Sequence, residues 1–216
     1  MRSILAGYRS LLDHIPPASA ALAIEKTEMG FALDALTLAL VYFEEANLCI
    51  QSGAFLSGGI VGAAMMEALL IAFGMLRKED VEKTVCFTQK NAKTQKSVFD
   101  WLKHSDLGSL LEIAQDLKWF ECSGVPETFK TLMSPYLSLA DQAELYSSLD
   151  GTADLGNKAA AAARTYRNFV HPGRCLRDSV ALNPEFGRLG CFYLVLAFAV
   201  LFDNNRINSQ IRSRNP

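Results

Sequence analysis

Two long segments in the first half of the chain have the spacing of α-helices and constrain the fold more than any other feature. In the first, from about Ser19 to Gln51, apolar side chains recur every three or four residues. Ser52-Gly53 interrupts this pattern, and the second segment, from Phe55 to about Arg77, is almost entirely apolar. Several small residues in it would let another helix approach closely. They are Gly58, Gly59, Gly62, Ala63 and Ala64.

Shorter helices are predicted elsewhere from their capping and apolar residues. The sequence predicts them over about 2–13, 98–103 and 107–120, with two short elements within 126–148. Asp106 or Ser105 is the expected cap of the helix that begins at Leu107. The charged segment between Glu79 and Ser97 is predicted to be the least ordered loop of the chain.

The last third of the chain is predicted to hold two more long helices. One begins at about Thr152 or Asp154 and runs through an alanine-rich stretch toward His171. The sequence Asn183-Pro184-Glu185 combines a cap, a proline and an acid, which is a strong start signal for a final helix to about Asn204. The residues after this helix read as a polar, basic tail.

The fold class follows from these patterns. No segment shows a sustained alternation of apolar and polar residues, which a half-buried strand would require. We therefore predict an all-α helical bundle in a single domain over 1–216, with a core at about 20–204 and a basic tail at 205–216. Its long helices are expected over 20–51, 55–77, 154–171 and 185–204.

Composition excludes several classes of protein. Half of the 216 residues are hydrophobic and a fifth are charged, which is the composition of a folded domain and not of a disordered chain. The formal net charge is -2, so the protein as a whole is not built to bind polyanions. A phosphate site would have to be a local basic patch, and arginines concentrate in 164–177 and in the tail.

No metal site, cofactor or membrane segment is predicted. The five cysteines include no Cys-x-x-Cys pair, and the three histidines have no metal-ligand spacing. Scattered, unpaired thiols suggest a reducing compartment, so we expect a cytoplasmic protein. The apolar segments 58–76 and 189–202 are interpreted as core helices, because Glu67 interrupts the first and the second is too short to span a bilayer.

The most suggestive residues for function lie at the end of the alanine-rich helix. If this helix reaches His171, then Arg167 lies one turn before it on the same face, and Arg164 joins the same stripe. Guanidinium groups bind phosphate, and an imidazole can transfer protons near neutral pH. These residues could therefore bind and cleave a phosphodiester without a metal ion.

A purely structural role fits the same residues. Basic side chains favour the last turn of a helix, and Pro172-Gly173 is an ordinary stop signal. In a variant of this interpretation an arginine forms a salt bridge with a buried carboxylate. Glu67 is the natural candidate, because it stands alone in an apolar segment and a buried carboxylate needs a partner.

Two pieces of the chain resemble the HEPN superfamily of all-helical domains. The first is the small-residue segment Phe55–Leu70, in which Glu67 precedes a Leu-Leu pair. The second is Leu107-Gly-Ser-Leu-Leu-Glu-Ile-Ala, followed later by Tyr166-Arg-Asn-Phe-Val-His-Pro-Gly173, which is similar to the family's Arg-Asn…His signature. The family motif has four to six residues between its arginine and histidine, whereas Arg167 and His171 are separated by three and Arg164 and His171 by six.

This resemblance implies a bundle that pairs as a homodimer, with the signature at the dimer cleft. Many members are metal-independent endoribonucleases of toxin–antitoxin, abortive-infection and other defence systems, so RNA, and an antitoxin or another defence protein, are implied partners. Arg167 and His171 would then be catalytic, supported by Arg164, Asn168, Glu67 and Arg174. Other members have lost catalysis and serve as binding modules, and in such a module Arg167 would be fully occupied by Glu67.

Overall fold

The computed structural model describes residues 26–152, 154–168 and 184–214, and these residues form an all-α bundle without any strand. The predicted fold class is therefore confirmed. The predicted helix over 2–13 lies outside the described residues. In chain order the elements are α2 (Lys26–Gln51), α3 (Phe55–Leu76), α4 (Lys78–Glu82), α5 (Val85–Asn91), α6 (Val98–Lys103), α7 (Leu107–Asp116), α8 (Glu127–Met133), the 3-10 helix η2 (Ser134–Tyr136), α9 (Leu139–Asp150), α10 (Leu155–Asn168) and α12 (Pro184–Arg214).

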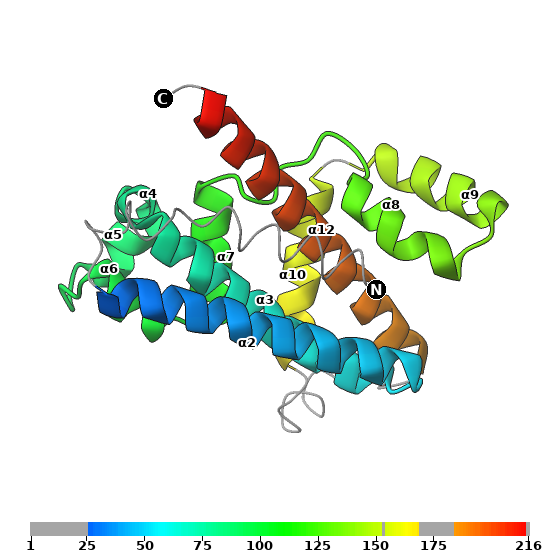
Figure 1. Cartoon of the computed structure of the whole chain (residues 1–216), viewed down its shortest axis with the longest axis horizontal. Helices are drawn as coiled ribbons and strands as arrows, with labels where there is room; N and C mark the ends of the chain where they lie inside the picture. The colour runs from blue at the N-terminus through cyan, green and yellow to red at the C-terminus, as the bar shows by residue number, and fades with distance from the viewer. Residues whose placement is uncertain (1–25, 153, 169–183, 215–216) are drawn as a thin grey trace.

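Helix α3 is the centre of the bundle. It packs against α2 along its length and also contacts α10 and α12 (Figure 1). The predicted role of its small residues is confirmed, because a side chain added at Gly58 would meet Ile50 of α2 at 3.0 Å, and one added at Gly62 would meet Leu194 of α12 at 3.1 Å. Neighbouring helices thus approach the α3 backbone closely on two sides.

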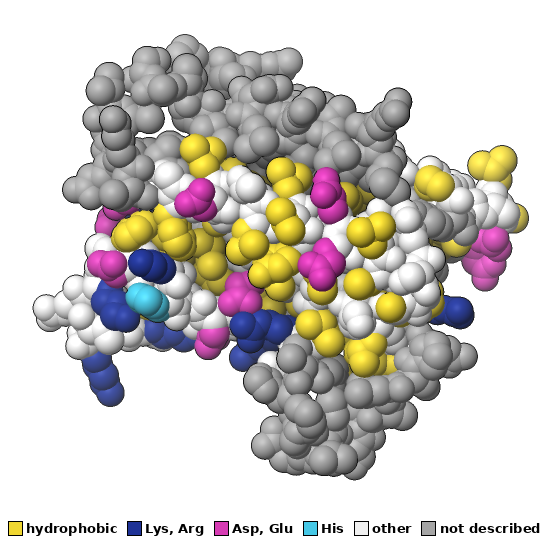
Figure 2. Space-filling model, turned by 60° about the horizontal axis from the view of Figure 1, so that its bottom comes forward, with side chains coloured by type: hydrophobic (Ala, Val, Ile, Leu, Met, Phe, Trp, Pro, Cys, Tyr) yellow, Lys and Arg dark blue, Asp and Glu magenta, His cyan; other side chains and the backbone are white. Residues whose placement is uncertain are grey.

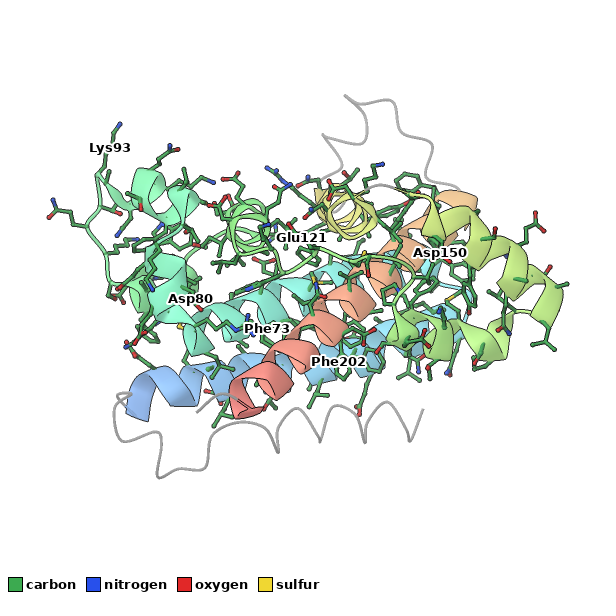
Figure 3. All side chains as sticks on the ribbon, turned by 90° about the horizontal axis from the view of Figure 1, so that it is seen from above. Phe73, Asp80, Lys93, Glu121, Asp150 and Phe202 are labelled. Atoms are coloured by element: carbon green, nitrogen blue, oxygen red, sulfur yellow. The ribbon has the colours of Figure 1, made fainter. Side chains whose placement is uncertain are left out.

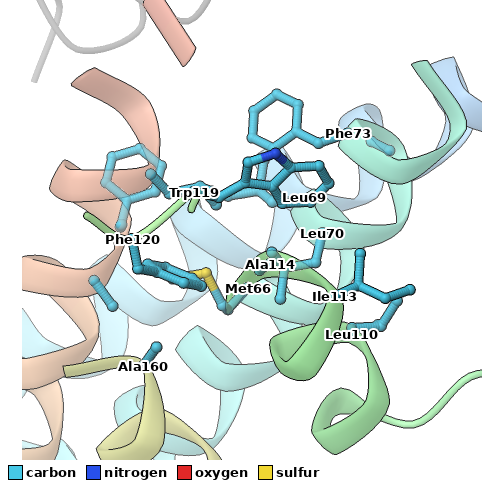
Figure 4. Packing of buried hydrophobic residues seen from close by; sticks show 14 of the residues in the cluster. Met66, Leu69, Leu70, Phe73, Leu110, Ile113, Ala114, Trp119, Phe120 and Ala160 are labelled. Carbon is cyan, nitrogen blue, oxygen red and sulfur yellow. The ribbon is translucent and has the colours of Figure 1, made fainter. Parts of the chain in front are cut away.

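The core lies between α3 and the helices that cross it. Seen from above, α7 and α10 lie side by side and nearly end-on (Figure 3). The side chain of Met66 of α3 points toward Phe120, and Leu70 of α3 lies near Ala114 and Ile113 of α7 (Figure 4). All of these side chains are almost completely buried, so α3 is fixed between α2 on one side and α7 and α10 on the other.

The predicted loop between Glu79 and Ser97 is wrong for most of its length, because it contains α4 and α5. Thr84 caps α5 by accepting a hydrogen bond from the backbone N–H of Phe87 (3.2 Å), and Phe87 is buried against Trp101. The lysines that suggested a loop are exposed, and of these only Lys90 lies within a helix, while Lys83, Lys93 and Lys96 lie between or after the helices. Lys93 marks the outer end of this region (Figure 3).

Helix α7 begins as predicted but ends early. The carboxylate of Asp106 accepts a hydrogen bond from the backbone N–H of Ser109 (2.7 Å), which identifies the cap. The helix ends at Asp116, not at Phe120, because Lys118 adopts a left-handed backbone conformation (φ 59°) that a helix does not continue through. This turn directs Trp119 and Phe120 into the core.

The last helix is longer than predicted. It begins at Pro184, as the start signal indicated, but continues through Arg214 into the segment expected to be a tail. Two neighbouring side chains tie it to distant parts of the chain. The Asp203 carboxylate accepts hydrogen bonds from the backbone N–H and hydroxyl of Thr128 at the start of α8, and Asn204 donates to the carbonyl oxygens of Trp119 (2.8 Å) and Glu121 (2.6 Å).

Two helices among the described residues, Phe55–Leu76 and Phe186–Asn204, are long and apolar enough to cross a membrane by length and composition alone. In the fold, 67% and 56% of their most apolar windows are buried. Packing in the core therefore accounts for their composition, and as membrane spans they are only weak candidates.

Helix α10 is held so close to its neighbours that one glycine should tolerate no side chain. A Cβ at Gly156 would lie 2.0 Å from the carbonyl oxygen of Phe120, which is backbone and cannot rotate away. We expect Gly156→Ala to lower the free energy of unfolding by about 1–3 kcal/mol or more through overpacking. Gly151→Ala, with no atom within 4 Å of the added Cβ, is the matched control and should be close to neutral in urea denaturation. Equal effects of the two substitutions would contradict this packing.

Candidate functional site

Helix α10 carries the candidate residues and owes its position to its small buried side chains. One face of it packs against α3, α7 and α12. At the end of this face the Tyr166 hydroxyl donates a hydrogen bond to the carbonyl oxygen of Phe186 (2.6 Å), and the Tyr166 ring lies against Gly190 of α12. The buried residues of α10 are Leu155, Gly156, Ala159, Ala160, Ala163 and Tyr166. This packing determines where the arginines of α10 point.

Arg167 forms a two-point ion pair with Glu67 of α3. Its Nε lies 2.9 Å from one carboxylate oxygen of Glu67, and its Nη2 donates a hydrogen bond to the other at 3.3 Å. The Glu67 side chain is 20% exposed and that of Arg167 is 40% exposed, so the pair lies at the edge of the core. The predicted salt bridge between an arginine and Glu67 is confirmed. One pair of guanidinium donors, on Nε and Nη2, is directed at this carboxylate.

The surroundings of Glu67 disfavour its negative charge, even with the ion pair to Arg167. Burial raises the pKa of the Glu67 carboxyl, and the charge and hydrogen bond of Arg167 offset only part of this effect. The negative charge of Asp106 raises it further. Arg167 thus satisfies a carboxylate that the core would otherwise destabilise.

Arg164 lies one turn before Arg167 and has different surroundings. It is exposed, and its guanidinium is so close to Gly108 that a Cβ there would lie 2.8 Å from Nη2. No hydrogen bond or ion pair joins it to the described part of the chain. Its positive charge helps to lower the pKa of both Asp106 and Glu112 on the α7 side, although the main causes are the backbone N–H of Ser109 for the first and Lys90 for the second.

A second charged group, not identified from the sequence, continues the site along α7. Lys90 of α5 forms an ion pair with Glu112 (2.6 Å) and donates a hydrogen bond to the hydroxyl of Ser109 (3.0 Å). The thiol of Cys86 donates to the same carboxylate at 3.3 Å. Lys90 and Glu112 are 22 residues apart on different helices, so no spacing in the sequence links them.

The chemistry of this second group is that of an ion pair and not of a nucleophile. Burial is the largest single influence on the pKa of Lys90 and lowers it, but the hydrogen bond to Glu112 and the nearby negative charges, which include Glu112 and Asp106, together raise it by more. The ammonium therefore keeps its proton and cannot act as a base toward Ser109. Burial, with the hydrogen bond to Glu112, raises the pKa of the Cys86 thiol to about 11, so it is not a thiolate at neutral pH.

The remaining candidate residues divide between described and undescribed parts of the chain. Asn168 is the last residue of α10, adjacent to Arg167. His171 and Arg174 lie outside the described residues. The structure therefore places Arg164, Arg167 and Glu67 together on one side of the bundle.

A small polar pocket at the start of α10 is separate from these arginines. It lies between the Cys122–Gly124 turn and the C-terminal end of α9, where Asp150 accepts a hydrogen bond from the backbone N–H of Val125 (2.9 Å; Figure 3). Backbone N–H groups of Gly156 and Gly124 donate to Cys122, but burial dominates and raises the pKa of this thiol. Within the described ranges, no three His, Cys, Asp or Glu side chains are grouped to hold a metal ion.

Comparisons of the chain with protein-family models, with curated proteins and with solved structures found no match.

The pairing of Arg167 with Glu67 can be measured by a double-mutant cycle. We expect Arg167→Met to destabilise more than Glu67→Gln, because it leaves a half-buried carboxylate without a partner. The double variant should be more stable than the sum of the two single losses predicts, with a coupling energy of about 1 kcal/mol. This energy is smaller than that of fully buried pairs because the Arg167 side chain is partly exposed. The exposed pair Lys118–Glu121 is the control and should show a smaller coupling. Additive effects at Arg167 and Glu67 would contradict the pairing.

The raised pKa of Glu67 predicts a dependence of stability on pH. At pH values between the ordinary pKa of a glutamate and the higher pKa of Glu67 in the folded chain, Glu67 holds a proton in the folded chain but has released it in the unfolded chain. The contribution that protonation of Glu67 makes to the free energy of unfolding is therefore fully present at pH values below the ordinary pKa, and it is lost as the pH rises through the folded-state pKa. We expect the stability of the wild type relative to Glu67→Gln, measured by urea denaturation, to decrease as the pH rises above the ordinary range of a glutamate carboxyl. A difference that does not change with pH would contradict this assignment.

Proposed function

We propose that this chain is a non-catalytic, HEPN-like binding module in which the Arg167–Glu67 pair joins α10 to α3. The single observation that carries the proposal is the two-point contact at 2.9 and 3.3 Å. A guanidinium whose Nε and Nη2 donate to a protein carboxylate has only its remaining N–H groups for a phosphate, and its charge is already matched by that carboxylate. Arg167 then has the role of a structural tie.

The charges around α10 support the same proposal. Among the described residues around α10, the three cations Arg164, Arg167 and Lys90 lie near three carboxylates. Each of the carboxyls of Glu67, Asp106 and Glu112 is close enough to at least one of these cations for the positive charge to lower its pKa. A groove for an RNA backbone needs an excess of positive charge, because most of the binding energy comes from neutralised phosphates. A balanced surface is more suited to a protein partner.

A metal-independent ribonuclease is the second candidate, and the exposure of Arg164 favours it. This guanidinium has no hydrogen bond or ion pair to a described residue, and Arg164 precedes His171 by seven residues in the sequence. In this function Arg164 would hold the phosphate and His171 would transfer the proton, while a second copy of the chain supplies a second histidine. A homodimer is therefore part of this candidate.

Cleavage of a mixed RNA in EDTA separates the two functions. We expect the purified wild-type protein to leave the RNA intact, and His171→Ala and Arg164→Ala, prepared identically, to behave in the same way. Circular dichroism of all three proteins checks that each is folded. RNA cleavage by the wild type that disappears in both variants would overturn the binding-module proposal and establish the ribonuclease.

A further inference from the structure

The hairpin of α2 and α3 has an unusual distribution of charge. Between residues 27 and 76 the chain contains five carboxylates and neither a lysine nor an arginine. Two of these carboxylates have partners from elsewhere in the chain, since Glu28 pairs with Lys78 (2.9 Å) and Glu67 with Arg167. The other three, Asp34, Glu44 and Glu45, are exposed and form no ion pair with a described residue.

These three carboxylates share one stripe of α2 with exposed apolar side chains. Every exposed position of α2 between residues 30 and 50 falls within an arc of about 140° at 3.6 residues per turn. We call this arc the α2 stripe. It consists of Leu33, Asp34, Thr37, Leu38, Val41, Glu44, Glu45 and Leu48.

The apolar side chains of the α2 stripe are the main exposed apolar surface of the described chain. Leu33, Leu38, Val41 and Leu48 are 37%, 45%, 52% and 65% exposed, and they are four of the seven large hydrophobic side chains that are exposed among the described residues. Figure 2 shows carboxylates set among apolar side chains across the middle of the molecule, with lysines and arginines gathered at the left and below the centre. A solvated helix face of this length usually carries cations as well as acids.

We propose that the α2 stripe is a docking surface for a basic amphipathic α-helix of a partner protein. Residues 33 to 48 extend over about 22 Å at 1.5 Å per residue, which is enough to contact four turns of a second helix. Val41 and Leu48 lie near the middle of the arc and would form the apolar seam, while Asp34, Glu44 and Glu45 flank it. Lysines or arginines beside the apolar row of the partner would meet these carboxylates.

The charge of the α2 stripe argues against other occupants. A second copy that docks through the same stripe would bring two sets of carboxylates together without any cation between them. An RNA backbone or an anionic membrane surface would be repelled in the same way. The partner helix must therefore be positively charged as well as apolar, and this inference rests on the proposed function as a binding module.

Direct binding of a defined probe tests the proposal. The probe is a fluorescent 14-residue helical peptide of leucine and lysine, with its leucines on one face, and fluorescence anisotropy measures its affinity for the full chain. We expect binding that weakens with salt, and an affinity about tenfold lower for the variant with Val41→Gln and Leu48→Gln. The variant with Glu44→Gln and Glu45→Gln should lose both affinity and part of the salt dependence.

A matched control comes from α9. Leu139 is 85% exposed and α9 also carries the exposed Glu144, so the variant with Leu139→Gln and Glu144→Gln removes similar groups from another helix. This control variant should bind the peptide as the wild type does. All substituted side chains are exposed, so the variants should remain folded, which thermal unfolding checks.

Three outcomes would overturn the α2 stripe as the docking surface. They are no binding of the leucine–lysine peptide, equal loss of binding in the α2 and α9 variants, and a wild-type dimer that becomes monomeric when Val41 and Leu48 are replaced. The dimer would be detected by sedimentation equilibrium. None of these outcomes involves RNA cleavage, so the docking surface can fail while the binding-module function stands. Conversely, RNA cleavage that depends on His171 would overturn that function whatever the peptide does.

Discussion

Close packing around α3 is the constraint on which the rest of the structure depends. The glycines of this helix bring α2 and α12 within van der Waals contact of its backbone, and its larger residues form the core with α7 and α10. A helix enclosed in this way has little room for charge, so its one carboxylate, Glu67, lies at the edge of the core and requires a cation. That cation comes from α10, a hundred residues later in the chain.

The position of α10 is set by contacts that leave no freedom of rotation. Gly156 lies against the Phe120 carbonyl at one end, and the ring of Tyr166 lies over Gly190 at the other, where any Cβ would meet the ring at 2.1 Å. With both ends fixed, two arginines one turn apart reach different neighbours. Arg167 meets Glu67 on α3, while Arg164 faces the start of α7. The sequence spacing makes the two arginines look equivalent, and the packing makes them different.

The sequence predicted what depends on local patterns and missed what depends on tertiary contacts. The helical class, the Asp106 cap and the start at Pro184 are all set within a few residues, and each was predictable. Helices α4 and α5 were missed because the charged, mixed composition of residues 79–97 suggested a loop, whereas a few buried side chains such as Phe87 hold the two helices in place. The partnership of Glu67 with an arginine could be expected because a lone acid in an apolar helix needs a cation. The ion pair of Lys90 with Glu112 could not, because neither residue is unusual in its own segment.

The absence of lysine and arginine between residues 27 and 76 links the inside of the bundle to its surface. A carboxylate that faces the core must find a positive partner within the chain, and Glu67 does so through Arg167. The carboxylates on the outer side of α2 face no such requirement, since water solvates them at little cost. Solvation does not explain why apolar side chains as exposed as Leu48 lie between them. Covering such side chains with another apolar surface lowers the free energy, because it removes them from water. The neighbouring carboxylates would favour a covering surface that also carries positive charge.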